Sequence, residues 1–212
     1  MHVVDLAGVE VRLGATPILV GVSLTVGPGE VVGVAGPNGA GKTTLLSVVS
    51  TLTPPSAGSG TILGARLGTA EVLAVRRRIG WSGHEPGLYP ELTLGENIRL
   101  TARLAGRSPA EADTALAAVG LAAASHRRAD HSSNGMQRRV DLARMLLLEP
   151  DLVLLDEAHA GLDAAAEDII DEILSRTRSR GGGALLVSHD ADRLARQVDR
   201  VVRIEAGVSR LG

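Results

Sequence analysis

Residues 36–43 read Gly36-Pro37-Asn38-Gly39-Ala40-Gly41-Lys42-Thr43 and match the pattern G-x-x-x-x-G-K-[ST]. The apolar run 31–35 precedes them and a segment with helical spacing, 42–52, follows, so we expect a strand, a loop and a helix in that order. Glycines allow consecutive backbone N–H groups to turn inward, and the N-terminus of the helix adds a positive partial charge. The stretch therefore predicts a loop that binds the phosphates of a nucleotide.

The polar side chains of this loop have distinct expected roles. Lys42 would reach the β- and γ-phosphates, and the Thr43 hydroxyl would ligate Mg²⁺. Lys42 is the only lysine beside 21 arginines. Since Lys is a slim point charge and Arg a planar fork, this is a position where Arg does not substitute. The expected nucleotide-binding residues are Gly36, Pro37, Asn38, Gly39, Ala40, Gly41, Lys42, Thr43 and Thr44.

A second set of polar residues follows later strands. The run 152–157, Leu-Val-Leu-Leu-Asp-Glu, predicts a buried strand that ends in two carboxylates. In one parallel sheet Asp156 would lie beside the loop and hold Mg²⁺, while Glu157 would position the attacking water; the alternative is that both acids cap the next helix. His189 ends the apolar strand 185–188. It is a candidate for contact with the γ-phosphate or the water, the alternative being a structural histidine.

Strand and helix patterns alternate around these motifs and predict an α/β fold, a P-loop NTPase core with a mostly parallel sheet covered by helices on both faces. We expect an antiparallel β edge at 3–13 and 18–26, a turn-rich loop at 53–60, and a core of about 1–82 and 150–212. An inserted helical subdomain of about 83–149 includes Ser108-Pro109-Ala110-Glu111, a capping box with Pro at the first helical position. The other expected strands are 31–35, 61–63, 78–81, 152–155, 184–188 and 201–204, and the expected helices are 42–52, 69–77, 93–104, 110–119, 135–148, 164–178 and 190–197.

Composition excludes several function classes. The chain has 212 residues, a net charge of −2 and no Cys, which excludes disulfides, Fe–S clusters and thiol nucleophiles. The near-neutral charge argues against a nucleic-acid partner, because binding to phosphodiester backbones needs a positive surface. We expect no membrane-spanning segment and no signal peptide, since the longest charge-free stretch, 43–65, contains two prolines and many hydroxyl groups.

A third motif lies on the helical insert. Residues 132–144 read Ser-Ser-Asn-Gly-Met-Gln-Arg-Arg-Val-Asp-Leu-Ala-Arg, and Ser133 precedes Asp156 by 23 residues. These motifs in this order resemble the nucleotide-binding subunit of ATP-binding cassette (ABC) transporters over essentially the whole chain. The resemblance implies a single ABC-type domain, 1–212, with a RecA-like core that binds ATP and Mg²⁺. It also implies that the signature residues of one subunit face the γ-phosphate held by the other subunit of an ATP-dependent homodimer. Those signature residues are Ser133, Asn134, Gly135 and Met136.

The same resemblance assigns further positions and shows departures from the family pattern. Asp163, in the sequence Ala160-Gly161-Leu162-Asp163, corresponds to the D-loop. His84 stands where the Q-loop glutamine is usual, and Leu13 stands where an aromatic residue normally stacks on adenine, so base stacking should be weaker. Met136 replaces the signature glutamine. None of these changes removes a phosphate, metal or water ligand, so the sequence predicts an ATP hydrolase in which Lys42, Glu157 and His189 are catalytic.

Within the family, residues 81–87, Trp-Ser-Gly-His-Glu-Pro-Gly, resemble the ATPase subunit of the haem exporter of cytochrome c biogenesis. The alternatives left open are a multidrug-type exporter ATPase and a soluble, non-transport ABC ATPase such as one in Fe–S assembly; a P-loop kinase of small metabolites is disfavoured by the signature. The transport reading implies an integral-membrane permease as partner, reached through a groove near 85–93. It implies a location in the cytoplasm, peripheral on the cytoplasmic face of the cell membrane.

Overall fold

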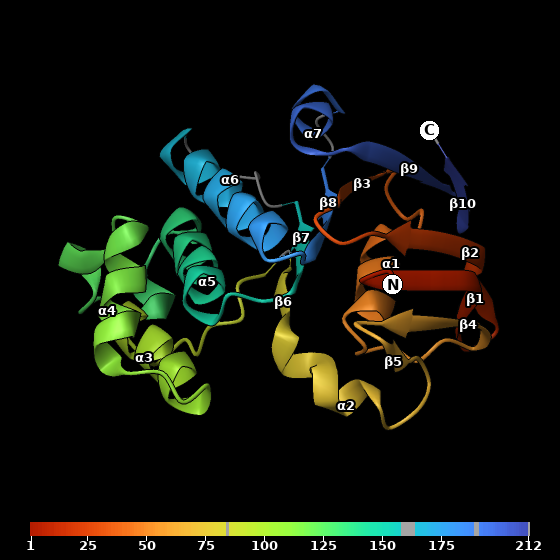
Figure 1. The fold of residues 1–212 in the computed structure, drawn as a ribbon. Coiled ribbons are helices and arrows are strands. Elements are labelled where there is room, and N and C mark those ends of the chain that lie inside the picture. Colours follow the sequence, from red (N-terminus) through yellow and green to blue (C-terminus); the bar gives the residue numbers. More distant parts are fainter. Residues whose placement is uncertain (84, 158–163, 189–190, 212) are drawn as a thin grey trace. The chain divides into compact units, whose positions relative to one another are not determined.

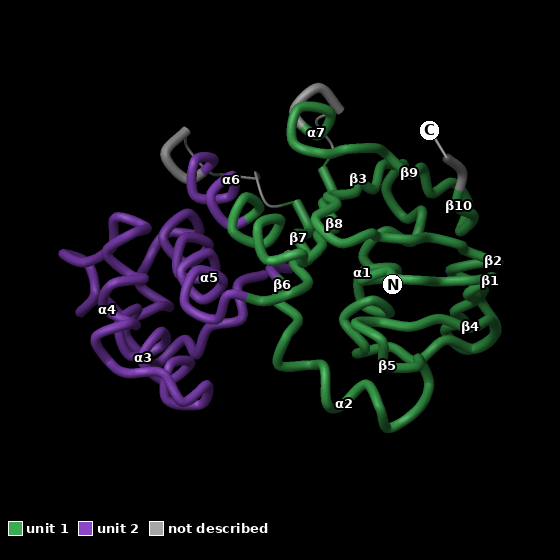
Figure 2. Tube along the Cα trace, in the orientation of Figure 1, with its two compact units in different colours: residues 1–81, 150–157, 174–212 green, residues 82–149, 158–173 purple. Residues whose placement is uncertain are grey.

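The computed structural model of the chain (Figure 1) describes residues 1–83, 85–157, 164–188 and 191–211. The chain divides into two compact units, which Figure 2 colours separately. Unit 1 comprises Met1–Trp81, Pro150–Glu157 and Leu174–Gly212. Unit 2 comprises Ser82–Glu149 and Ala158–Ile173.

The larger sheet of unit 1 carries the two phosphate-site motifs. Its strand order is β10-β9-β3-β8-β7-β6. β3 pairs in parallel with β8 and β9, β7 pairs in parallel with β8, and only β10 is antiparallel to β9 among the pairings described. Every residue of β7 and β8 is buried, which is typical of parallel strands covered on both faces. The strands are β3 (Val31–Ala35), β6 (Ile79–Ser82), β7 (Leu152–Asp156), β8 (Gly183–Val187), β9 (Arg200–Glu205) and β10 (Val208–Leu211).

The second sheet is antiparallel, as expected for the β edge. Its order is β2-β1-β4-β5, with β1 (Val4–Leu13), β2 (Thr16–Val26), β4 (Ala57–Ile62) and β5 (Ala65–Arg66). The expectation that 53–60 forms a loop was wrong from Ala57 onward. Gly58 explains the difference, because its φ is +85° and a Cβ there would lie 2.3 Å from the carbonyl oxygen of Gly8. The glycine that suggested a turn instead lets β4 approach β1 closely.

Helices complete the core of unit 1. α1 (Lys42–Val49) buries Leu45, Leu46, Val48 and Val49 in a cluster that also contains side chains of β1, β2 and β3. The helix expected at 69–77 is shorter, since α2 (Val72–Val75) passes into a 3₁₀ turn, η1 (Arg76–Arg78). α6 (Ala164–Ser179) and α7 (Ala191–Gln197) follow β7 and β8 in the chain. This alternation confirms the predicted α/β fold class.

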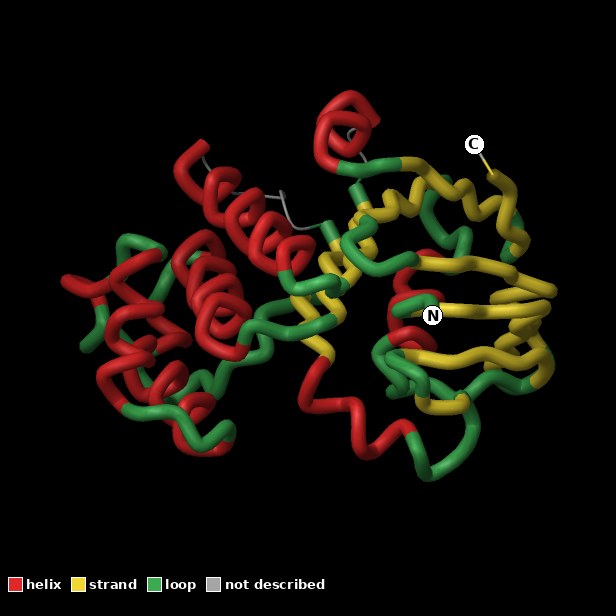
Figure 3. Tube along the Cα trace, in the orientation of Figure 1, coloured by secondary structure: helices red, strands yellow, loops and turns green. Residues whose placement is uncertain are grey.

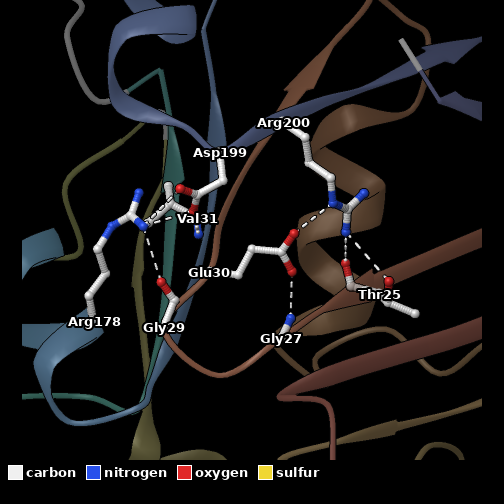
Figure 4. Close-up of polar contacts among 8 residues, drawn as sticks. All are labelled: Thr25, Gly27, Gly29, Glu30, Val31, Arg178, Asp199 and Arg200. Atoms are coloured by element: carbon white, nitrogen blue, oxygen red, sulfur yellow. Dashed lines mark hydrogen bonds and ion pairs between the residues drawn. The ribbon is translucent and has the colours of Figure 1, made fainter.

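Two ion pairs fix the turn between β2 and β3, as Figure 4 shows. Arg178 contacts Asp199 at 2.8 Å and donates to the carbonyl of Gly29, and Asp199 accepts from the N–H of Val31 at 2.7 Å. Arg200 contacts Glu30 at 2.6 Å. These pairs anchor the start of β3, the strand that leads into the phosphate loop.

Unit 2 is helical (Figure 3). It contains α3 (Leu94–Leu104), α4 (Pro109–Ala118), α5 (Asn134–Leu148), the part of α6 up to Ile173, and two 3₁₀ turns, η2 (Ala122–Ala124) and η3 (Ala129–His131). The predicted capping box of Ser108 with Glu111 is confirmed, and Thr93 forms a second one with Glu96. Across the described parts of both units, no helix combines the length and the hydropathy needed to cross a bilayer.

Candidate nucleotide site

The loop at 36–43 depends on two of its glycines. Gly36 has a φ of +151°, and a Cβ there would lie 2.1 Å from the carbonyl oxygen of Ile204. Gly41 has a φ of +101° and caps the N-terminus of α1, and a Cβ there would lie 2.7 Å from Leu19. Larger residues would displace β9 or β2, so the glycines permit a loop that lies directly against the neighbouring strands.

The Lys42 ammonium lies inside this loop. Its Nζ donates hydrogen bonds of 2.9 Å to the carbonyl oxygens of Gly36 and Pro37, and the residue is only 7% exposed. Pro37, Asn38 and Gly39 are exposed, so the crest of the loop is open to a ligand. The arrangement places one positive charge and the N-terminus of α1 in one small region, which suits a polyanion.

The structure brings Thr43 and Asp156 together across 113 residues of sequence. Thr43 Oγ1 donates to Asp156 Oδ2 at 2.7 Å, and Asp156 is 2% exposed at the end of β7. A hydroxyl and a carboxylate are hard oxygen donors, as Mg²⁺ prefers. Within the described residues, no three or more His, Cys, Asp or Glu side chains form a metal-binding cluster. One carboxylate is enough for Mg²⁺, because this ion commonly keeps water and phosphate oxygens as its other ligands.

Glu157 has an unusual backbone. Its φ is +55°, which is rare for a residue other than glycine, and its N–H donates to the carbonyl of Val187 at 3.0 Å. Such a conformation costs of order 1–3 kcal/mol and is found mainly where a side chain must be aimed. The backbone therefore supports Glu157 as a functional candidate, because among the described non-glycine residues with a positive φ it is the one that directly follows the strand ending in Asp156.

Leu13 ends β1 at the hairpin with β2 and is 63% exposed. Ile18 and Leu19, further along β2, lie against Gly41, so this hairpin and the phosphate loop are neighbours in unit 1. An exposed aliphatic side chain near a phosphate loop is consistent with an apolar contact for a base. His84, Asp163 and His189, which the sequence assigns to the same chemistry, lie outside the described residues.

The signature residues form the N-terminus of α5 in unit 2. Ser133 is the N-cap, and its Oγ accepts from the N–H of Met136 at 3.3 Å. Asn134 and Gly135 supply backbone groups of the first turn. Gln137 braces the turn, because its Nε2 donates to the carbonyl oxygens of Ala129 at 2.7 Å and Ser132 at 3.2 Å. The result is a rigid helix N-terminus of the kind that favours anions.

Sequence reasoning gave no role to one polar pair of α5. Asp141 is 4% exposed and contacts Arg144 at 2.9 Å. Burial raises the pKa of the Asp141 carboxyl, against the opposing effects of Arg144, Ser82 and the N–H of Gly87. An acid three residues before an arginine, among the apolar residues 140–147, was the available signal.

Comparison with known proteins places these features in a family. The family model described as "ABC transporter" matches residues 19–160. The cytochrome c biogenesis ATP-binding export protein CcmA 2 of Cupriavidus metallidurans is 40% identical over 84% of this chain and 85% of its own length. The methionine import ATP-binding protein MetN of Caulobacter vibrioides is also 40% identical, over 92% of this chain.

The chain spans 61% of the length of that MetN protein. Among solved structures, an ATP-binding cassette described as a dimer in a post-hydrolysis state bound to ADP and Pi superposes with a TM-score of 0.86. It is 27% identical and covers 98% of both chains. Fold and sequence therefore agree on the same relatives.

Proposed function

The chain belongs to the ABC transporter family, and from that premise we propose that it binds and hydrolyses ATP as a homodimer and drives transport through an integral-membrane permease. The observation that carries the proposal is the bond from Thr43 to the buried Asp156 beside the Lys42 ammonium. These groups come from the glycine loop and from the end of a parallel strand, where phosphoryl-transfer chemistry needs a cation, a metal ligand and inward N–H groups.

Phosphate binding, Mg²⁺ ligation and positioning of the attacking water fall to different residues of the site. Lys42 exchanges its contacts with the Gly36 and Pro37 carbonyls for phosphate oxygens, and the N–H groups of 36–44 bind the same anion. Thr43 and Asp156 hold Mg²⁺, which when bound neutralises charge on the phosphates. Glu157 orients the attacking water, and its left-handed backbone aims the carboxylate. His84, His189 and Asp163 are proposed as helpers of this step on the family resemblance.

The homodimer supplies the second half of the site. The Ser133-capped N-terminus of α5 is an anion site that lies on unit 2, whereas the loop at 36–43 belongs to unit 1. In our proposal the turn of one protomer binds the γ-phosphate held by its twin, so that closure requires ATP. The dimeric ADP- and Pi-bound cassette, at 27% identity, supports this assembly.

The proposed contact with the permease lies in unit 2. A surface depression of about 240 Å³ is lined by Gly87, Tyr89, Leu104 and Arg144 among others. Tyr89 is 58% exposed and Leu104 is 72% exposed, so two large apolar side chains stand at its rim without cover from the described residues. Exposed aromatic and aliphatic side chains beside polar groups suit a protein partner. The cytoplasmic face of the membrane is the corresponding location.

For the cargo, we propose haem export for cytochrome c biogenesis. Support comes from the CcmA 2 protein of Cupriavidus metallidurans, because this chain spans 85% of its length at 40% identity. Residues 81–87 add the pattern W-x-G-H-x-P-G, on which the resemblance to the haem-exporter ATPase rests. Affinity purification of the tagged chain from its native host, followed by mass spectrometry, identifies the membrane partner. Recovery of a drug-efflux or amino-acid permease in place of a haem-export permease would reject this cargo.

The ATPase proposal is tested with Glu157→Gln. With ATP and Mg²⁺ this variant should form a stable homodimer in size-exclusion chromatography with light scattering, while its turnover falls by about 100-fold or more. Wild type should turn over ATP without an added acceptor, and Lys42→Ala should neither bind nor hydrolyse it. A Glu157→Gln protein that stays monomeric with saturating ATP would contradict the dimer, and ATP cleavage by Lys42→Ala would contradict the site.

A further inference from the structure

Asp141 and Arg144 form a polar centre inside the helical unit. Both lie on α5, one helical turn apart, and Arg144 Nη1 contacts Asp141 Oδ1 at 2.9 Å. The Asp141 side chain is 4% exposed and the Arg144 side chain 31% exposed. The pair is therefore a mostly buried salt bridge on a helix whose other buried residues are apolar except Arg138.

The pair holds both ends of one loop. Ser82 Oγ donates to Asp141 Oδ2 at 3.1 Å, and Arg144 Nη1 donates to the carbonyl of Gly87 at 3.0 Å. The Gly87 N–H also bonds to the Asp141 carboxylate. A Cβ on Gly87 would lie 3.1 Å from Arg144 Nη1, so the loop backbone rests on the guanidinium. Residues 82–87 are thus fastened to α5 at their first and last positions.

The same helix carries the signature turn at its other end. α5 is continuous from Asn134 to Leu148, and Asp141 lies about 10 Å along its axis from Asn134 at 1.5 Å per residue. The amides of Met136 and Gln137 are held in the first turn of α5, because their N–H groups donate to Ser133 Oγ and to the Ser133 carbonyl oxygen. Because α5 joins the loop at 82–87 to this turn, releasing the loop from Asp141 and Arg144 should also loosen the hydrogen bonds of the turn.

Burial opposes the charge of this pair. Burial raises the pKa of the Asp141 carboxyl in spite of its three hydrogen-bonding partners, so the anion is less stable here than in water. Arg144 Nε is buried without a hydrogen-bond partner in the described residues. Buried ion pairs can often be replaced by neutral groups at little cost in stability. The contacts of the pair with Ser82 and Gly87 give it a positioning role in the loop.

We propose that the Asp141–Arg144 pair is a positioning element that locks the loop at 82–87 to the signature end of α5. Arg144 and Gly87 also line the depression assigned to the permease, so a partner seated there presses on this pair directly. The inference rests on the proposed ATPase function for its catalytic consequence only. The mechanical link itself is a property of unit 2 and can be measured without nucleotide.

The link is tested by hydrogen exchange on three variants of the full chain. Asp141→Asn keeps the shape of the side chain and removes its charge, and Ser82→Ala removes the contact from the loop side. Asp113→Asn is the matched control, because Asp113 pairs with Arg99 at 2.7 Å on the same unit but is 52% exposed. Asp141→Asn and Ser82→Ala should both speed exchange at 85–89 and at the Met136 and Gln137 amides by about tenfold, as expected for loss of one or two hydrogen bonds. Asp113→Asn should change neither.

Kinetics separates positioning from damage to the fold. Asp141→Asn should lower kcat for ATP about tenfold or more, while the Kd for a fluorescent ATP analogue stays within about twofold, because unit 1 holds the nucleotide. Faster exchange confined to 82–89, with Met136 and Gln137 unchanged, would overturn the proposal. So would a wild-type kcat in Asp141→Asn. If wild type itself fails to cleave ATP, the ATPase proposal falls, whereas the exchange data still decide this one.

Discussion

Replacing Gly36 with alanine tests how closely the phosphate loop is fitted to its sheet. A Cβ at this position would lie 2.1 Å from the Ile204 carbonyl oxygen, a distance that real Cβ atoms do not reach. Ile204 is fully buried in β9, so it cannot turn aside as an exposed side chain would. The loop must therefore move outward by about 1 Å, and a misplacement of this size costs on the order of 100-fold where groups must be aligned.

Gly39→Ala provides the comparison within the same loop. Gly39 also has a positive φ, +76°, but a Cβ there would meet nothing within 4 Å. Its cost is the strain of a left-handed alanine alone, about 1–2 kcal/mol. Since 1.4 kcal/mol corresponds to a factor of ten, this strain weakens binding by at most about 30-fold.

The assay is titration with a fluorescent ATP analogue in the presence of Mg²⁺. We expect the Kd to rise by about 100-fold or more in Gly36→Ala and by clearly less in Gly39→Ala. Thermal unfolding by circular dichroism checks that both variants are folded. If the two variants bind nucleotide within about threefold of each other, contact between the loop and β9 does not determine binding, and the reasoning fails.

Three further predictions follow from burial and charge. Leu155→Ala, in the fully buried β7, should lower the free energy of unfolding in urea by about 2–5 kcal/mol, whereas Leu73→Ala, which is 59% exposed, should change it by less than about 0.5 kcal/mol. Burial alone would raise the pKa of Glu30 and of Asp199, but hydrogen bonds from Arg200 and Gly27 to Glu30, and from Val31 and Arg178 to Asp199, lower both. The ionised forms therefore stabilise the fold above about pH 4.5, and this stabilisation is lost as the pH falls through the lowered pKa values. Combining Glu30→Gln with Asp199→Asn should therefore lower the free energy of unfolding at pH 7 by at most about 1 kcal/mol per pair. The double variant should also lose less stability than wild type as the pH is lowered. Leu13→Trp should tighten binding of an ATP analogue by about 2- to 10-fold if the exposed Leu13 lies against the base, because aromatic stacking adds about 0.5–1.5 kcal/mol; an unchanged Kd would place the base elsewhere.

The sequence sufficed where a residue's neighbours along the chain determine its conformation. The glycine loop, the capping box at Ser108 and the buried strand ending in Asp156 are local patterns, and the structure confirms the fold class built on them. Local patterns failed where pairing with a strand distant in sequence determines the conformation. Gly58 is the example, because its close approach to Gly8 makes an expected turn part of β4. β10 was missed for a related reason, because a four-residue edge strand carries too little periodicity to be distinguished from a loop.

Three of the site residues carry a cost that only the structure reveals. Glu157 adopts a left-handed backbone, burial raises the pKa of the Asp141 carboxyl, and the Lys42 side chain lies almost out of solvent. Each cost is tolerable only because rigid elements surround it: β7 and β8 are buried throughout, and α5 is one uninterrupted helix. Rigid elements that hold strained or charged groups in place do not have to rearrange when a phosphate binds. Electrostatic catalysis requires such preorganised groups. The unfavourable residues and the buried strands beside them therefore serve the same requirement, and weakening either should reduce activity before it unfolds the chain.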